Sequence, residues 1–146
     1  MNVRALGLLG VVAFVAILGL ILFAGPSAGS AANDFMHALQ AGDVDRLTEL
    51  SYVPKEDGQK IRKQWEFCIH TATPYYNFLW HPSFVRQISD DEVVVKMKVV
   101  KNAENSSSYD EDYDLCMVKV DNKWKVDVYR LNGKFYPALP KPSSDF

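Results

Sequence analysis

Apolar residues run without interruption near the start of the chain and recur at regular periods after it. From Ala5 to Ala24 no side chain is charged or strongly polar. About 20 such residues, each rising 1.5 Å along a helix, can cross the hydrocarbon core of a bilayer, which is about 30 Å thick. The pattern therefore predicts a transmembrane anchor over residues 1–25, followed by a short tether over 26–30.

A cleaved signal peptide is the alternative, because Arg4 gives a basic start and small residues follow Pro26. The apolar run is longer than the usual signal-peptide core of about 7–15 residues, which favours a retained anchor. After it, Asp34 and Asp43 precede the first basic residue, Arg46. The positive-inside rule then keeps the amino end cytoplasmic. We expect a single-pass protein in membrane lipid whose remaining chain is extracytoplasmic, on the periplasmic or extracellular side.

The next part of the chain has the period of amphipathic helices. A first stripe spaced at i, i+3, i+4 and i+7 ends at Gly42, and Asp43 can cap a second helix over 44–50. A third helix is expected over about 55–73, ended by Pro74. The residues of the first stripe are Ala32, Phe35, Met36 and Leu39.

After Pro74 the apolar period changes to two, which is typical of strands. Strands are expected over 84–89, 92–100, 113–120 and 123–131, joined by turn-forming sequences such as Asp121-Asn122. Three apolar faces follow from the alternation: Val93, Val95, Met97 and Val99; Cys116, Val118 and Val120; Trp124, Val126 and Val128. Helices followed by an antiparallel meander predict an α+β domain over 31–132 with its helices on one face of the sheet.

This order of elements, and the segment "FMHALQAGDVDRLTELS" over 35–51, resembles the nuclear-transport-factor-2-like (NTF2-like) superfamily of cone-shaped α+β domains. The resemblance rests on a first-helix pattern and on a Trp that follows the last strand turn, Trp124 here. The pattern is matched by Phe35, Ala38, Leu39, Gly42, Asp43 and Leu47. It implies a curved sheet whose helices enclose a pocket, which can host an enzyme site, a ligand or nothing.

Charge and composition narrow the classes of partner. Lys and Arg number 16 and Asp and Glu 18, and Arg4 is the only charged residue among the first thirty. The rest of the chain is therefore acidic overall, without the basic excess that binds nucleic acid. Cys68 and Cys116 have no Cys or His neighbour at the spacing of a metal site. We expect no nucleic acid, no metal and no cofactor.

The pocket implied by the resemblance has candidate lining residues from several segments. Asp112 and Asp114 would lie at its mouth if their face of the strand turned inward, but the acidic run to which they belong is more typical of a solvated hairpin. No pair of ionisable groups stands at a spacing diagnostic of acid–base catalysis. We therefore expect no enzyme. The other candidates are Trp65, Tyr75, Tyr76, Phe78, Trp80 and His81.

Two features remain open from the sequence. Cys68 and Cys116 each lie on an apolar face, so they could form a disulfide or remain two buried free thiols. The tail over 133–146 is rich in proline and cannot join a sheet easily. It could be a frayed end, or a peptide that docks on a neighbour through Phe135, Tyr136 and Phe146.

Two functions from different classes follow. The first is a non-catalytic accessory subunit that is tethered to a membrane and interacts with integral-membrane proteins. The second is a small NTF2-like enzyme of the isomerase, dehydratase or hydrolase type, or a binder of a small apolar ligand. The anchor, the small size and the missing catalytic constellation favour the first.

Overall fold

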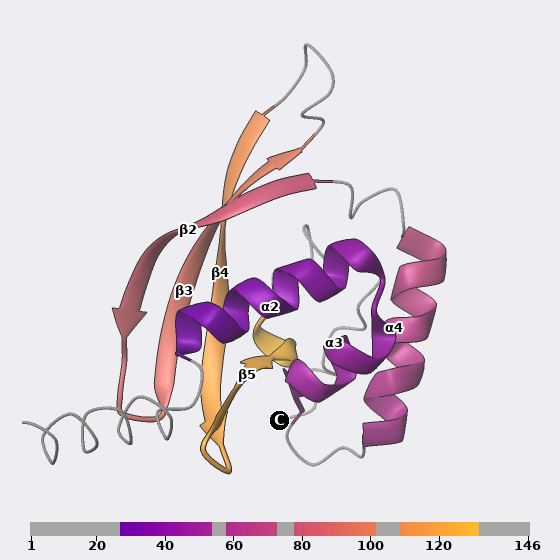
Figure 1. The fold of residues 1–146 in the computed structure, drawn as a ribbon, viewed down its shortest axis with the longest axis horizontal. Coiled ribbons are helices and arrows are strands. Elements are labelled where there is room, and N and C mark those ends of the chain that lie inside the picture. The colour runs from indigo at the N-terminus through magenta and orange to yellow at the C-terminus, as the bar shows by residue number, and fades with distance from the viewer. Residues whose placement is uncertain (1–26, 54–57, 73–77, 102–108, 132–146) are drawn as a thin grey trace, which may run out of the picture.

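The computed structural model describes residues 27–53, 58–72, 78–101 and 109–131 (Figure 1). These residues form three α-helices and a five-stranded sheet, which confirms the predicted α+β class. In chain order the elements are α2 (Ala28–Ala41), α3 (Val44–Leu50), β1 (Ser51–Tyr52), α4 (Gly58–Ala72), β2 (Phe78–Gln87), β3 (Glu92–Lys101), β4 (Tyr109–Val120), β5 (Lys123–Asp127) and the 3-10 helix η2 (Val128–Arg130).

The first two helices begin and end at residues whose side chains or backbone suit those positions. Ser27 caps α2 by accepting a hydrogen bond from the Ser30 N–H. Gly42 ends α2 with a φ of 68°, in the left-handed region that glycine adopts at little cost. Asp43 then caps α3 by accepting from the Arg46 N–H at 2.9 Å. Because α2 begins at Ala28, the predicted tether over 26–30 is wrong in its second half.

The sheet has the strand order β1-β5-β4-β3-β2 and is mixed rather than antiparallel throughout. β2, β3, β4 and β5 form the predicted meander, and the two-residue β1 pairs in parallel with β5. The turn between β4 and β5 has positive φ at both Asp121 and Asn122, as the tightest hairpin turns require. The parallel strand was missed because two residues show no period.

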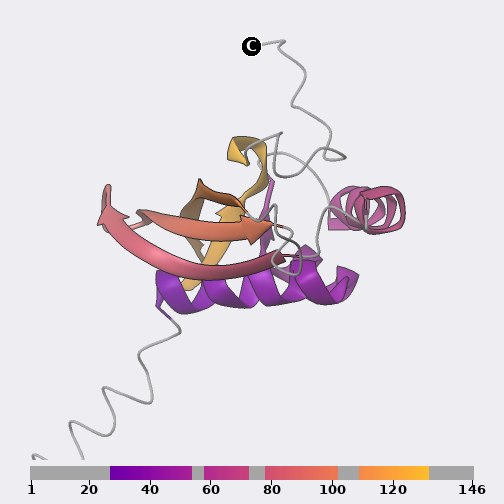
Figure 2. The ribbon, with the colours of Figure 1, turned by 90° about the horizontal axis from the view of Figure 1, so that it is seen from above.

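Helix α2 lies across one face of the sheet, with α3 and α4 beside it (Figures 1 and 2). The strand side chains on this face belong to the same hydrophobic core as Phe35, Met36 and Leu39 of α2. We call it the helix-covered face. Its strand members include Val93, Val95, Met97 and Val99 of β3, Tyr113, Leu115 and Met117 of β4, and Val126 of β5.

The opposite face of the sheet carries no α-helix among the described residues, and we call it the open face. Successive side chains of a strand alternate between faces, so the residues between the core members lie here. Those of β3 and β4 are Val94, Lys96, Lys98, Asp112, Asp114 and Cys116. The structure therefore has one layer of α-helices on one layer of strands. On the second side of the strands η2 lies at one end, through Arg130 and Glu92, and Val94 and Cys116 are buried there.

Two predictions about the strands are corrected. The first long strand begins at Phe78, six residues earlier than expected. The prediction missed its first part because a bulge between Pro82 and Phe84 reverses which residues face inward. A single period of two cannot describe a strand with such a bulge. The last strand ends at Asp127 instead of 131, and its chain continues as η2.

Several predicted features lie outside the described residues: the anchor over Ala5–Ala24, the tail with Phe135, Tyr136 and Phe146, and the aromatic pair Tyr75 and Tyr76. Within the described ranges, no helix combines the length and the apolar character needed to cross a bilayer.

Candidate functional site

The space between the helices and the sheet is filled by large apolar side chains. Trp65 of α4, Phe78 of β2 and Met97 of β3 are each at most 2% exposed and belong to one core cluster. The Trp65 ring meets Phe35 edge to face, with 5.7 Å between ring centroids. Two residues predicted to line a pocket, Trp65 and Phe78, are thus part of the packed core.

Polar groups in this interior are few and satisfied. Of the residues that the structure describes, Ser51 is the only polar one, apart from tyrosine and cysteine, to be buried. Its hydroxyl accepts a hydrogen bond from Trp65 Nε1 at 2.9 Å and donates one to the Leu47 carbonyl oxygen at 2.7 Å. A buried indole N–H would be costly without such a partner. The pair therefore positions α4 against α3 and β1 and offers no acid–base chemistry.

Asp112 and Asp114 do not face this interior. They are exposed on β4, directly opposite Lys98 and Lys96 of β3. The prediction that they lie at a pocket mouth under the helices is wrong, because the register places Tyr113, Leu115 and Met117 against the core. In the run Leu115–Val118 the residues on both faces of the strand are apolar, so the sequence alone could not show which face points inward.

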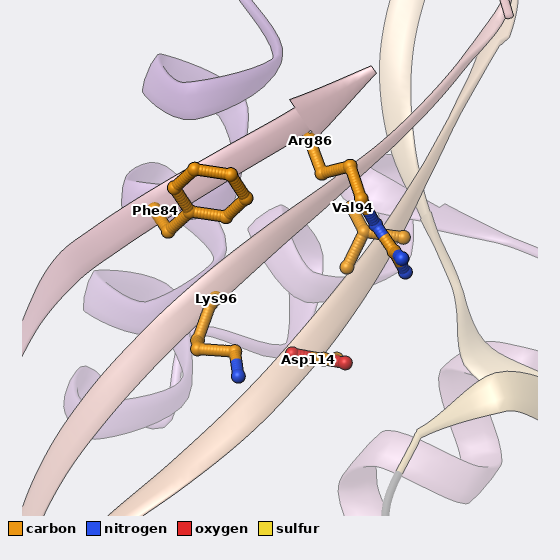
Figure 3. A pocket seen from close by; sticks show the side chains of 5 residues that line it. All are labelled: Phe84, Arg86, Val94, Lys96 and Asp114. Carbon is orange, nitrogen blue, oxygen red and sulfur yellow. The ribbon is translucent and has the colours of Figure 1, made fainter. Parts of the chain in front are cut away.

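The open face is hollowed at the position of Asp114 (Figure 3). The hollow has a volume of about 250 Å³ and is lined by Phe84 and Arg86 of β2, Val94 and Lys96 of β3, and Asp114 of β4. In Figure 3 these side chains lie on the viewer's side of the strands, with the helices behind. Three neighbouring strands therefore combine one aromatic ring, two cations and one carboxylate on this face.

The charges around the hollow are unpaired. Within the described part of the chain, Arg86, Lys96 and Asp114 make no ion pair within 4.0 Å. The Phe84 side chain beside them is 60% exposed. Such a combination can accept a partner surface that carries both charges and apolar groups.

One end of the open face is closed by an ion pair from the end of the described chain. Arg130 of η2 donates to Glu92 Oε1 of β3 at 2.5 Å. Asp127 accepts from the Tyr129 N–H at 3.2 Å and so begins η2, while burial raises the pKa of its carboxyl group. These contacts hold η2 against the start of β3.

The remaining predicted lining residues are split between the two sides. Trp80 is half-buried: its Nε1 donates to Asn33 Oδ1 at 3.1 Å, and the His37 ring lies edge-on to it at 4.7 Å between centroids. His81 is exposed and stands opposite Lys98. The structure therefore does not bring Trp80 and His81 together with Asp112 and Asp114 in one enclosed pocket.

A second hollow, of about 280 Å³, lies between α2 and α3. Arg46 on its wall donates to Asp34 at 3.1 Å and to Glu49 at 2.6 Å. Because these carboxylates already engage the guanidinium group, Arg46 acts as a clamp between the two helices. Exposed ion pairs of this kind contribute little to stability, about 0–1 kcal/mol.

Both cysteines are buried free thiols, which is the second of the two predicted alternatives. Cys68 belongs to the core cluster on the helix side, whereas Cys116 lies on the open face next to Asp114. The sheet separates them, so of the two alternatives left open by the sequence the disulfide is not formed. Burial raises the pKa of Cys68 to about 11 and also raises the pKa of Cys116, so both thiols stay protonated and unreactive near neutral pH.

The raised pKa of Cys68 predicts a loss of stability at alkaline pH. The folded state keeps the thiol proton up to about pH 11, whereas the unfolded chain releases it near 9.0, so stability falls as pH rises between these values. We expect the free energy of unfolding to drop by about 1 kcal/mol more between pH 8 and pH 10 in the native chain than in Cys68→Ala. Urea unfolding at the two pH values measures it. Equal drops in the free energy of unfolding of the two proteins would contradict the raised pKa of Cys68.

Sequence reasoning missed Phe84, Arg86, Val94 and Lys96 as site residues. Each was interpreted only as a strand position, because the signal that unites them is the cross-strand register: Phe84 stands opposite Lys96, Arg86 opposite Val94, and Lys96 opposite Asp114. The alternation of cationic residues on β3 with acidic residues on β4 was visible in the sequence. Without the register it had no spatial meaning.

No protein-family model matches the chain, and no curated protein matches it significantly. Among solved structures it is similar to an NTF-2 like protein of unknown function from Shewanella oneidensis, with a TM-score of 0.47 and 9% identity over 66% of this chain and 88% of that one. A SEC-C motif containing protein from Rhodopseudomonas palustris gives 0.47 and 14%, covering 75% and 84%. A Campylobacter jejuni protein provisionally named an NTF2-like transpeptidase gives 0.46 and 19%, covering 65% and 92%. At these values the likeness carries no argument about activity.

Proposed function

We propose that this protein is a non-catalytic, membrane-tethered interaction subunit whose α+β domain, of the NTF2-like type, acts through its surface. The observation that carries the proposal is the contrast between the two sides of the sheet. The helix-covered side is filled by side chains such as Trp65 and Phe78, and the open side presents unpaired charges beside an exposed ring. A protein that works through an enclosed site needs the opposite arrangement.

The filled interior supports the non-catalytic part of the proposal. General acid–base catalysis needs an ionisable group that is held near the substrate with an adjusted pKa. The described core holds a Trp–Ser hydrogen bond, the thiol of Cys68, which stays protonated near neutral pH, and Tyr113, whose hydroxyl donates to Glu111. Neither the Trp–Ser pair nor the thiol can transfer a proton or attack a substrate at neutral pH without a base beside it.

The apolar segment Ala5–Ala24 supports the membrane part of the proposal, on sequence grounds. Its length and lack of charge suit a single-pass anchor, with the amino end cytoplasmic and the domain on the extracytoplasmic side. Ser27 caps the first helix of the domain only a few residues after this segment. A domain held so close to the bilayer is well placed to meet integral-membrane partners, and we propose these as its interaction class.

The alternative is a small enzyme or a binder of an apolar ligand. It would need an enclosed space with two polar groups within hydrogen-bond reach. Trp65, Phe78 and Met97 fill the place where the resemblance implies a pocket, which counts against an enclosed site there.

The proposed anchoring and assembly predict how the full chain fractionates. We expect the chain to sediment with membranes, to resist extraction by alkaline carbonate and high salt, and to be released by mild detergent in a complex heavier than one chain. Native mass measurement of the detergent extract gives the size. A chain recovered free in solution with its apolar segment removed, or a chain that is a lone monomer in the extract, would contradict the proposal.

A further inference from the structure

We propose that the edge of the sheet formed by β2 lies on the surface of the bilayer, with Phe84, Val85 and Ile88 in the layer of lipid headgroups. We call these three residues the β2 patch. The inference rests on the membrane anchor of the proposed function and adds to it a lipid-binding surface of the domain itself. It depends on the apolar side chains that β2 exposes, on the place where the chain enters the domain, and on the form of the strand edge.

Exposed apolar side chains are concentrated on β2. Among the described residues five large apolar side chains are exposed, and four of them lie on β2 or directly after it. These four are Leu79, Phe84, Val85 and Ile88, and the fifth is Phe67 of α4. Exposed apolar residues that are gathered in one place, and not scattered singly, mark a surface that contacts a protein or a membrane.

The same stretch of chain carries almost no charge. From Phe78 to Ser89 the sequence holds no acidic residue, and Arg86 is its only Lys or Arg. Among the described residues Arg86 makes no ion pair within 4.0 Å. A guanidinium group binds phosphate well, and phosphate is the anionic group of lipid headgroups. An apolar strand with one unpaired arginine therefore suits the boundary between lipid and water.

The chain enters the domain at the end where the β2 patch lies. Near the end of α2, Gln40 donates to the Phe78 carbonyl oxygen at 2.8 Å. Nearer its start, Asn33 accepts from Trp80 Nε1 at 3.1 Å, so α2 runs antiparallel to β2. The start of α2 therefore lies toward the last part of β2, and both views of the fold place the two at the same end of the domain (Figures 1 and 2).

Covalent geometry holds this end of the domain at the membrane surface. Only Gly25 and Pro26 separate Ala24, the last residue of the apolar segment, from Ser27, which caps α2. Three residues span at most about 11 Å. The headgroup layer on each side of the hydrocarbon core is about 5–8 Å thick. The start of α2 is therefore held within this layer or just outside it, where the β2 patch can reach the headgroups.

The positions of the patch residues require an edge-on contact. Phe84 stands opposite Lys96, on the open face. Val85 stands opposite Val95, whose side chain belongs to the helix-covered face. A surface that covered either face would touch one of the two patch residues and leave the other in water. The edge of the sheet brings both into one layer, where water and headgroups can bond to the unpaired backbone groups of the edge.

The form of this edge favours lipid over a strand of another protein. β2 is an edge strand, with β3 as its only neighbour in the described sheet. Pro82 lacks a backbone donor, and the bulge between Pro82 and Phe84 twists the edge, so both features oppose the addition of a strand. A bilayer surface needs no register of backbone groups. These interruptions therefore do not weaken a contact with lipid.

The turn after the patch limits the depth of the contact. Asp90 and Asp91 are exposed between β2 and β3, and carboxylates are costly inside hydrocarbon. Ile88 is held beside this turn, because its N–H donates to the Glu92 carbonyl oxygen at 2.9 Å. The patch therefore enters the headgroup layer and not the hydrocarbon core. Its contact depends on apolar groups and not on attraction to anionic lipid.

The test measures the depth of single positions in the full chain, reconstituted in phosphatidylcholine vesicles that contain no other protein. Phe84→Cys and Ile88→Cys each receive an environment-sensitive fluorophore, and part of the lipid carries a quencher on the upper acyl chain. Cys68 and Cys116 are buried, so the folded chain takes the label at the introduced position. Interfacial groups lie about 5–10 Å into the boundary of headgroups and acyl chains, so we expect both labels to lose at least about half of their emission.

Phe67 provides the matched control. It is 59% exposed, close to the 60% of Phe84, but it belongs to α4, at the other end of the domain from the start of α2 (Figures 1 and 2). A label at Phe67→Cys should lose less than about a tenth of its emission. Phe84→Glu should reduce the quenching of the label at Ile88 at least about threefold, because a carboxylate leaves the boundary for water. Phe67→Glu, the same change at the control position, should leave that quenching unchanged.

Flotation of the same vesicles after washing with alkaline carbonate separates this inference from the anchor. A chain that floats, but whose labels at Phe84 and Ile88 are quenched no more than the label at Phe67, overturns the proposal and leaves the anchor in place. A patch that binds only a membrane protein gives this result too, since the vesicles hold no other protein. A chain that does not float overturns both. Circular dichroism checks folding, and if Ile88→Cys does not fold, Val85→Cys replaces it with the same expected quenching.

Discussion

Replacing Trp65 with alanine should lower the free energy of unfolding by about 3–5 kcal/mol, the range for truncating a buried tryptophan. Trp65 is completely buried, its ring packs on Phe35, and its Nε1 donates to the Ser51 hydroxyl. Its removal leaves a cavity at the junction of α4 with α3 and β1. Since small domains have only about 5–15 kcal/mol of stability, the loss is a large part of the total. Urea or thermal unfolding measures it.

Two milder changes separate the ring from its hydrogen bond. Trp65→Phe keeps most of the packing and should cost about 1–2 kcal/mol, and Ser51→Ala should cost about 1–3 kcal/mol because it leaves a buried N–H without an acceptor. The double variant should lose less than the sum of the two, by about 1 kcal/mol, because both changes remove the same bond. If the costs of Trp65→Phe and Ser51→Ala simply added in the double variant, the two residues would not share a hydrogen bond. A loss below about 1 kcal/mol in Trp65→Ala would show that the indole is not buried as described.

Placing a carboxylate at Leu115 should destabilise the domain by at least about 4 kcal/mol. Leu115 is fully buried on the helix-covered face, directly opposite Val95 of β3. No described cation reaches this position to pair with a carboxylate, so Leu115→Asp must take up a proton or unfold. Its folded-state pKa is therefore raised, and the loss should be smaller at pH 5 than at pH 8. Circular dichroism during urea titration at both pH values gives the comparison.

The matched control introduces the same carboxylate on the other face of the same strand. Val118 is half-buried on the open face and stands opposite Glu92. Val118→Asp should cost about 1 kcal/mol or less, because one side of the residue meets solvent. If Val118→Asp were as damaging as Leu115→Asp, the assignment of the two faces of β4 would be wrong.

Several elements could be predicted because a single local period or residue decides them. The stripe with Phe35, Met36 and Leu39 fixed the buried side of α2, and Gly42 with Asp43 fixed the boundary between α2 and α3. The inward face of β3 was also predicted correctly. Its residues Val93, Val95, Met97 and Val99 are all apolar, whereas the other face carries Lys96 and Lys98. In each case one choice buries apolar surface and the alternative buries charge.

The candidate site could not be predicted, because its parts belong to three strands. On β4 both faces of the strand carry apolar residues: Leu115 and Met117 on one, Cys116 and Val118 on the other. The sequence alone therefore does not show which face is buried. Only pairing with β3, where Val95 meets Leu115, turns Cys116 and Asp114 to the open face. On β2 the bulge at Pro82 exchanges the two faces halfway along the strand, which placed Phe84 and Arg86 beside Lys96.

By itself the sequence determined the α+β class, the three helices, their boundaries to within a few residues, and the strands of the meander. These depend on short-range periods and on residues with special backbone preferences. The tertiary structure alone decided which face of β4 is buried, the parallel pairing of β1 with β5, the separation of Cys68 from Cys116, and the meeting of Phe84, Arg86, Lys96 and Asp114. The reason is physical: a period specifies two faces of a strand, but only the register of its neighbours selects the one that the helices cover.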